Sequence, residues 1–182
     1  NCTNYGLIWT FGDNEHGVWS PGYTLLNDVT GQIFTDGEGA WGMYAADGSQ
    51  ATNLGFIWPI GEDAHGMGAV NGSFAENLGM IWVEGTNAYG MFATGSSDLV
   101  NGGSILTSGV WGLGMNAVYG SSAINSGDIT TESADAVGIL VTQDSTGTNT
   151  GTITTSGFRA DGMLASGNSA ISNSGSIDTS GD

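Results

Sequence analysis

Two histidines are the first side chains of this sequence whose chemistry could serve catalysis, as general bases or as metal ligands. His16 and His65 occupy the same place of an internal repeat, two copies apart, with Trp41 in that place of the copy between them. A catalytic constellation needs a nucleophile, a base and an orienting acid within hydrogen-bond reach. Neither histidine has a neighbouring nucleophile or cysteine, so we expect no catalytic residue and no enzyme activity.

Carboxylates are the second candidates, because they recur near one turn of the repeat. Like charges about 5 Å apart repel each other by roughly 0.8 kcal/mol even in a water-like dielectric, and a divalent cation would relieve that repulsion. Loosely bound Ca²⁺ is therefore one hypothesis, and a solvated acidic edge that keeps the protein soluble is the alternative. We expect no other cofactor. The calcium candidates are Asp13, Asp36, Glu38, Glu62, Asp63 and Glu84.

Aromatic residues give the sharpest signal, because they recur at two places that strand alternation turns outward. A contiguous exposed stripe of this kind usually marks an interface. Three uses remain open: packing against identical chains, stacking on the sugar rings of a glycan, or mutual stacking that only stabilises the surface. The interface or glycan-stacking candidates are Trp9, Trp19, Phe34, Tyr44, Trp58, Trp82 and Phe92.

A repeat of 24 residues must position all of these side chains. Counting places from a recurrent asparagine, the third place is glycine in all eight copies and the fifth is isoleucine in all eight, from Ile8 to Ile177. The fourteenth place is glycine in all seven full copies, from Gly17 to Gly162. Self-similarity at such a period indicates stacked units, each of which cannot bury its apolar face alone.

The composition of each copy favours strands over helices. Short alternating runs such as "GSILT" and "GTITT" are bounded by glycine, serine and asparagine, and a period of 3.6 residues is missing. We expect an all-β parallel β-solenoid with three short strands per coil, seven full coils and a partial eighth. The single domain spans 1–182, as part of a longer chain or assembly. Its coils start at 4, 29, 53, 77, 101, 125, 149 and 173.

The recurrent asparagine is predicted to form a structural ladder. Equal places of neighbouring coils lie about 4.8 Å apart, so side-chain amides can hydrogen-bond along the solenoid axis. The ladder residues are Asn53, Asn77, Asn101, Asn125, Asn149 and Asn173.

The amino-acid sequence of the later coils resembles that of known surface proteins. The segments "NSGDITT" (125–131), "NTGTITTSGFRADGMLASG" (149–167) and "NSGSIDTSG" (173–181) are similar to the repeats of bacterial autotransporter-type passenger domains and related surface β-solenoids. The resemblance covers the chain in register and implies the architecture and an extracellular or bacterial cell-surface location. It transfers no catalytic residue, and the outward aromatic residues of the first half depart from the pattern.

Charge narrows the range of partners. The chain has 18 acidic side chains, one basic side chain and a net charge of -17, so we expect no nucleic-acid partner. No apolar run approaches the roughly 18 residues of a membrane span, so we expect no membrane insertion of this segment.

These observations predict a non-catalytic extracellular structural protein. We expect a segment of a surface fibre or filament built by stacking coils, with self-association as a homopolymer or within a longer chain of the same repeats, and with a possible adhesive role. The alternative is a glycan-binding adhesin that uses the aromatic stripe. A polysaccharide-active β-helix enzyme is a remote alternative, because insertions of one residue build no cleft.

Overall fold

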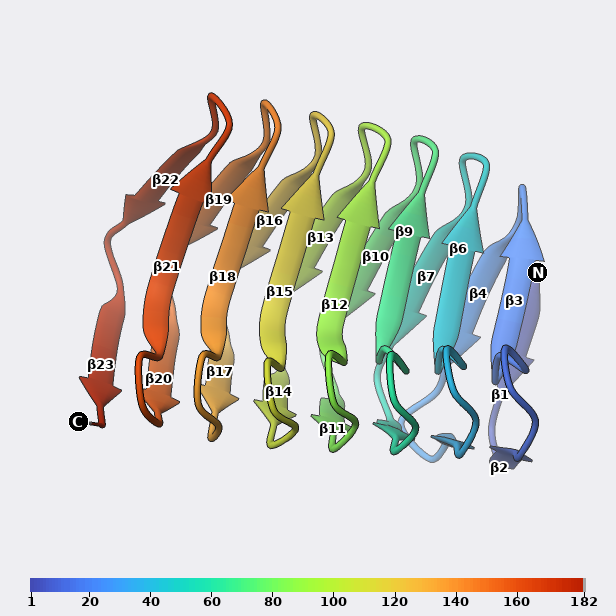
Figure 1. The fold of residues 1–182 in the computed structure, drawn as a ribbon. Helices are drawn as coiled ribbons and strands as arrows, with labels where there is room; N and C mark the ends of the chain where they lie inside the picture. The colour runs from blue at the N-terminus through green and yellow to red at the C-terminus, as the bar shows by residue number, and fades with distance from the viewer. Residues whose placement is uncertain (182) are drawn as a thin grey trace.

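A computed structural model describes residues 1–181 as a solenoid of stacked coils with the two termini at opposite ends (Figure 1). Its 23 strands form three parallel sheets of eight, eight and seven strands, and each full coil contributes one strand to each sheet. The predicted all-β solenoid with about 24 residues per coil is confirmed. Among residues 1–181 there is no helix that could cross a membrane.

The three sheets are named A, B and C here. Sheet A consists of β1 (Cys2–Asn4), β4 (Thr24–Asn27), β7 (Gln50–Asn53), β10 (Phe74–Asn77), β13 (Asp98–Asn101), β16 (Ser122–Asn125), β19 (Thr146–Asn149) and β22 (Ala170–Asn173). Sheet B consists of β2 (Leu7–Thr10), β5 (Gln32–Thr35), β8 (Phe56–Pro59), β11 (Met80–Val83), β14 (Ser104–Thr107), β17 (Asp128–Thr131), β20 (Thr152–Ser156) and β23 (Ser176–Ser180). Sheet C consists of β3 (Val18–Pro21), β6 (Met43–Ala46), β9 (Met67–Val70), β12 (Tyr89–Thr94), β15 (Leu113–Val118), β18 (Val137–Thr142) and β21 (Asp161–Ser166).

An asparagine ladder runs along the end of sheet A. From Asn4 to Asn149, the Nδ2 of each ladder asparagine donates to the Oδ1 of its counterpart in the next coil, over 2.8 or 2.9 Å. The same Nδ2 atoms also approach backbone carbonyls of the turn that follows, such as Gly103 O at 3.3 Å from Asn101. The ladder holds all six predicted asparagines and two more, Asn4 and Asn27.

The second coil corrects the predicted boundary at residue 29. Asn27, and not Val29, pairs with Asn4 and with Asn53 in the sheet register, while Val29 is 68% exposed. The reason is a longer turn: residues 28–31 lie between Asn27 and β5, whereas only residues 54–55 lie between Asn53 and β8. Gly31 N donates to Asp28 O at 2.8 Å and closes this turn, so the strands keep their register.

The core explains why two places of the repeat never vary. The fifth-place isoleucines from Ile33 to Ile153 are at most 1% exposed. A Cβ added to Gly90 would collide with the Cγ2 methyl of Ile105 and lie 2.6 Å from the backbone oxygen of Gly114. The same relation holds for every fourteenth-place glycine and the fifth-place isoleucine that follows it. The branched methyl group therefore fills the space that the missing side chain leaves.

Alternation along sheet B places the aromatic residues outside. In β11, Ile81 and Val83 are fully buried, whereas Met80 is 39% exposed and Trp82 is half-buried. Residues two apart share a face of a strand, so the fourth and sixth places of every coil form the outer surface of sheet B.

Candidate binding surface

An aromatic wall covers the outer face of sheet B over the first four coils. We define it as Trp9, Phe11, Phe34, Phe56, Trp58 and Trp82. Trp9 lies beside Phe34 and Phe34 beside Trp58 in the strand register. Trp58 and Trp82 are stacked, with ring centroids 5.1 Å apart and an interplanar angle of 6°. The structure thus brings the four predicted sheet B residues together.

Two members of the aromatic wall were missed from the sequence. Phe56 occupies the fourth place and packs edge-on against Phe34 at 5.9 Å. Phe11 follows β2 and stacks on Trp9 at 4.9 Å. The signal for Phe56 was present in the strand period of two, which turns the fourth place to the same side as the sixth.

A second aromatic row covers the outer face of sheet C. The predicted residues Trp19, Tyr44 and Phe92 share the sixteenth place, where Gly68 leaves a gap in the sequence pattern. Trp41 fills that gap, because a Cβ on Gly68 would lie inside its indole ring. Trp41 contacts Tyr44 and Phe92 with centroid distances of 4.9 and 5.8 Å. The row is therefore continuous from Tyr44 to Phe92, and sequence reasoning had not included Trp41.

The two histidines belong to this second row and act as parts of its packing. His65 Nδ1 accepts a hydrogen bond from the backbone N–H of Tyr89, and His16 Nδ1 accepts one from Trp41, both at 3.1 Å. The His65 ring stacks on Tyr89 with a centroid distance of 4.5 Å. Burial lowers the pKa of His65 to about 4 and also lowers the pKa of His16. Each neutral imidazole thus has its basic nitrogen engaged by the backbone, which suits a structural role.

Acidification is expected to destabilise the fold through His65. Its folded-state pKa lies below the unfolded value of 6.5, so the unfolded chain binds the proton more tightly, and stability present at pH 7 is lost as the pH falls from 6.5 toward 4. The expected loss between pH 7 and pH 5 is about 2 kcal/mol. Denaturant melts at both pH values measure it. His65→Gln should lose most of this pH dependence and His16→Gln less of it; an unchanged pH dependence in His65→Gln would contradict the assignment.

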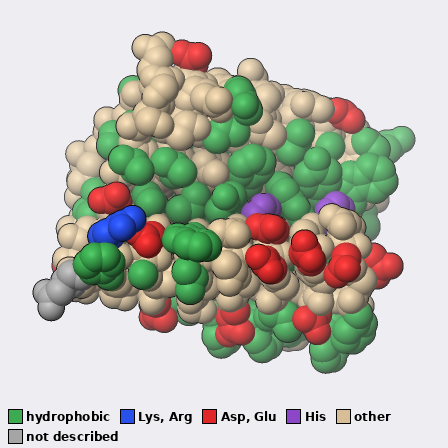
Figure 2. All heavy atoms as spheres, in the orientation of Figure 1, with side chains coloured by type: hydrophobic (Ala, Val, Ile, Leu, Met, Phe, Trp, Pro, Cys, Tyr) green, Lys and Arg blue, Asp and Glu red, His purple; other side chains and the backbone are tan. Residues whose placement is uncertain are grey.

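The predicted calcium residues are all exposed in the structure. Asp13 Oδ1 accepts a hydrogen bond from the backbone N–H of Glu38 at 3.1 Å, which links two neighbouring turns. Within residues 1–181, no three His, Cys, Asp or Glu side chains come together in a way that could hold a metal ion. Figure 2 shows the acidic side chains as a band on this face, with hydrophobic side chains on both sides and the histidines at its border. This arrangement favours a solvated acidic edge.

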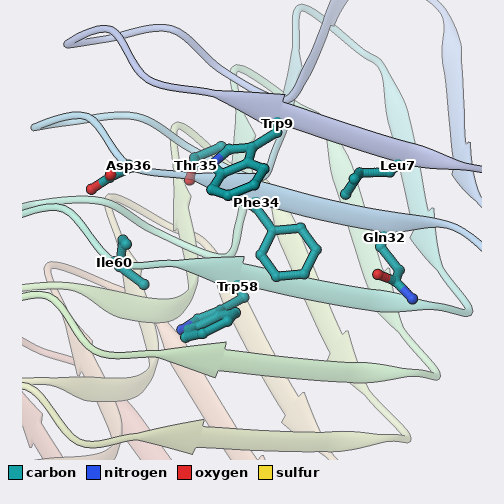
Figure 3. Close-up of a pocket in the computed structure, with 8 residues that line it drawn as sticks. All are labelled: Leu7, Trp9, Gln32, Phe34, Thr35, Asp36, Trp58 and Ile60. Atoms are coloured by element: carbon teal, nitrogen blue, oxygen red, sulfur yellow. The ribbon is translucent and has the colours of Figure 1, made fainter.

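A half-open hollow of about 300 Å³ lies within the aromatic wall, over β2, β5 and β8. Trp9, Phe34 and Trp58 line it in a row across three successive strands, with Leu7 and Gln32 on one side and Asp36 and Ile60 on the other (Figure 3). The Trp9 and Phe34 rings are 6.0 Å apart and inclined by 44°, and the Phe34 and Trp58 rings are 5.4 Å apart and inclined by 62°. The three ring planes therefore differ, and together they form one wall of a half-open hollow.

Comparison with known proteins identifies a family for this chain. Residues 20–182 match the model of the family described as "BigA third pectate lyase-like domain", which is well over half of the chain. No curated protein and no solved structure matches the sequence. The match fits a surface β-solenoid repeat protein, as the sequence resemblance indicated. With its parallel coils, its asparagine ladder and this match, the chain belongs to the family of the BigA third pectate lyase-like domain.

Proposed function

We propose that this chain is a non-catalytic, rigid segment of a bacterial surface protein and that its aromatic wall makes it adhesive. The observation that carries the proposal is the wall itself: six aromatic side chains on one side of the molecule, in ring contact from coil to coil between Trp9 and Trp82. A contiguous apolar patch on the surface of a protein usually marks a binding site. The stacked coils present it on a regular parallel sheet.

A lyase acting on pectate is the activity that the family description suggests, and the residues of this chain do not favour it. Pectate is a polyanion, so its binding calls for basic groups or a bridging cation, and elimination needs a base to remove a proton. Arg159 is the one basic side chain of the sequence. It forms an ion pair with Asp135 over 2.6 Å and lies six coils away from Trp9. Fold-level likeness alone does not carry catalysis.

Self-association is the second candidate, because apolar exposure extends beyond the hollow to Leu78 and Met80, which are 48% and 39% exposed. A neutral glycan stacked on the open face of Trp9 is the third. Light scattering over a range of concentrations separates self-association from adhesion. A monomer at every concentration would favour adhesion alone, whereas oligomers that dissociate in Trp58→Ala and Trp82→Ala would favour the self-association that the sequence predicts.

Two assays test adhesion and the lack of catalysis. Beads coated with the chain should be retained on surfaces that carry neutral glycans or phospholipid headgroups, and the Trp9→Ala, Trp58→Ala double variant should lose this retention. Tyr119→Ala, at an aromatic residue 61% exposed outside the aromatic wall, is the matched control and should keep it. Polygalacturonate should stay intact with and without Ca²⁺. Retention that survives in the double variant, or cleavage of the polymer, would overturn the proposal.

A further inference from the structure

The hollow in the aromatic wall combines two features that point to one kind of ligand. Its walls are almost entirely apolar, and the differently inclined indole and phenyl rings of Trp9, Phe34 and Trp58 line it from three successive strands. Ring faces carry negative electrostatic potential and attract cations within about 6 Å of the ring centroid. Pockets of about 300 Å³ are at the small end of ligand sites. The hollow therefore suits a small ligand with apolar surface and positive charge.

Charge around the hollow agrees with this. Asp36 is the one ionisable side chain among the residues that line it. The whole chain has a net charge of -17, and its single basic side chain is paired with Asp135. A carboxylate beside aromatic faces in a strongly negative protein repels anions and concentrates cations. An anionic sugar or a phosphate group alone is a poor occupant.

The apolar lining also distinguishes between ligands by the number of hydrogen-bond partners that they need. A primary ammonium carries three donors that need hydrogen-bond partners when water is removed. The polar side chains at the hollow are Asp36, Gln32 and Thr35, and the Thr35 hydroxyl donates to the carbonyl of Ala40 at 3.4 Å. A sugar faces the same shortage, because each of its hydroxyl groups needs a partner. A quaternary ammonium has no N–H donor, and its methyl groups match the rings.

We propose that the hollow binds the trimethylammonium group of choline, with Trp9, Phe34 and Trp58 as the aromatic cage and Asp36 as the counter-ion. This inference rests on the proposed function, since it names the ligand of the same aromatic wall. Leu7 and Ile60 close the sides of the cage with apolar contact. The choline hydroxyl end remains toward solvent, so a choline that is attached to a larger molecule can also enter.

The decisive experiment is a calorimetric titration of the whole chain with choline chloride, compared with the uncharged isostere in which carbon replaces nitrogen. We expect choline to bind and the isostere to bind about tenfold more weakly, because the two share shape but not charge. Salt should weaken choline binding, since the attraction to Asp36 is screened. Equal affinity for both ligands, or no choline binding, would overturn the proposal.

Variants locate the binding in the hollow. Trp58→Ala should lower choline affinity about tenfold or more, and Asp36→Asn should lower it several-fold and reduce its salt dependence. Trp19→Ala removes an indole with the same exposure as Trp9, 57% against 56%, from sheet C and should bind choline normally. Circular dichroism melts verify that each variant is folded. Choline binding unchanged in folded Trp58→Ala would place the ligand elsewhere.

Bead retention separates this inference from the proposed function. If free choline fails to bind while the Trp9→Ala, Trp58→Ala variant still loses retention on glycan or lipid surfaces, the aromatic wall is adhesive but its ligand is not choline. If free choline competes with retention on phosphatidylcholine surfaces, both proposals stand. If retention never depends on the aromatic wall, the proposed function fails, whatever choline does.

Discussion

Asn101→Leu is expected to lower the free energy of unfolding by about 4 kcal/mol. Asn101 is fully buried, accepts from Asn77 Nδ2 and donates to Asn125 Oδ1, both over 2.8 Å. Leucine removes both bonds and leaves one buried donor on Asn77 and one buried acceptor on Asn125 without their ladder partners. Each buried group left in this way costs about 1–3 kcal/mol. Denaturant unfolding followed by circular dichroism measures the loss.

The same substitution at Asn116 is the matched control and is expected to have a much smaller or opposite effect. Asn116 is 6% exposed, and its Oδ1 has no hydrogen-bond partner among residues 1–181. Its register neighbours are Phe92 and Leu140, so leucine continues an apolar row. A gain of up to about 1 kcal/mol is expected. Equal losses at Asn101 and Asn116 would show that the ladder hydrogen bonds have no special weight.

The architecture could be predicted because stacking forces equal residues into contact. Ile33 must pack on Ile57 and Asn53 on Asn77, and the register shows these pairs. Residues at the same place of the 24-residue repeat therefore stack on one another along the solenoid. The start of the second coil could not be predicted in this way. The longer turn after Asn27 changes the spacing between the ladder asparagine and the next strand, while the strands keep their register. Only the hydrogen-bond register distinguishes Asn27 from Val29 as the ladder residue.

The candidate site could be predicted only in part. Strand alternation turns Trp58 and Trp82 outward, and it needs no knowledge of side-chain rotamers. The hollow depends on the side-chain conformation of each ring, which is set by contacts between coils such as that of Phe34 with Trp58. The position of Trp41 is another such case, because a turn residue crosses to the place that Gly68 leaves open. Such contacts are not encoded in the repeat period.

The fourteenth-place glycines give the other large expected effect. Gly114→Ala should lower the free energy of unfolding by about 4 kcal/mol, because its Cβ would lie 2.5 Å from the backbone oxygen of Gly138 and closer still to the Cγ2 of Ile129. Neither neighbour can retreat easily: one is strand backbone, and the other is a fully buried side chain in a close-packed core. The strands of neighbouring coils would have to separate.

Gly147→Ala is the control, because it makes the same chemical change inside a strand of sheet A. Its Cβ would meet only side-chain atoms, the nearest being Val141 Cγ1 at 3.1 Å, and Ala123 already occupies the same place one coil earlier. The variant should stay within about 1 kcal/mol of the wild type, and the loss of backbone freedom in the unfolded state favours it. Chemical denaturation of both variants under one condition measures the difference. If Gly114→Ala proved as stable as Gly147→Ala, the invariance of the fourteenth place would need a cause other than packing against isoleucine.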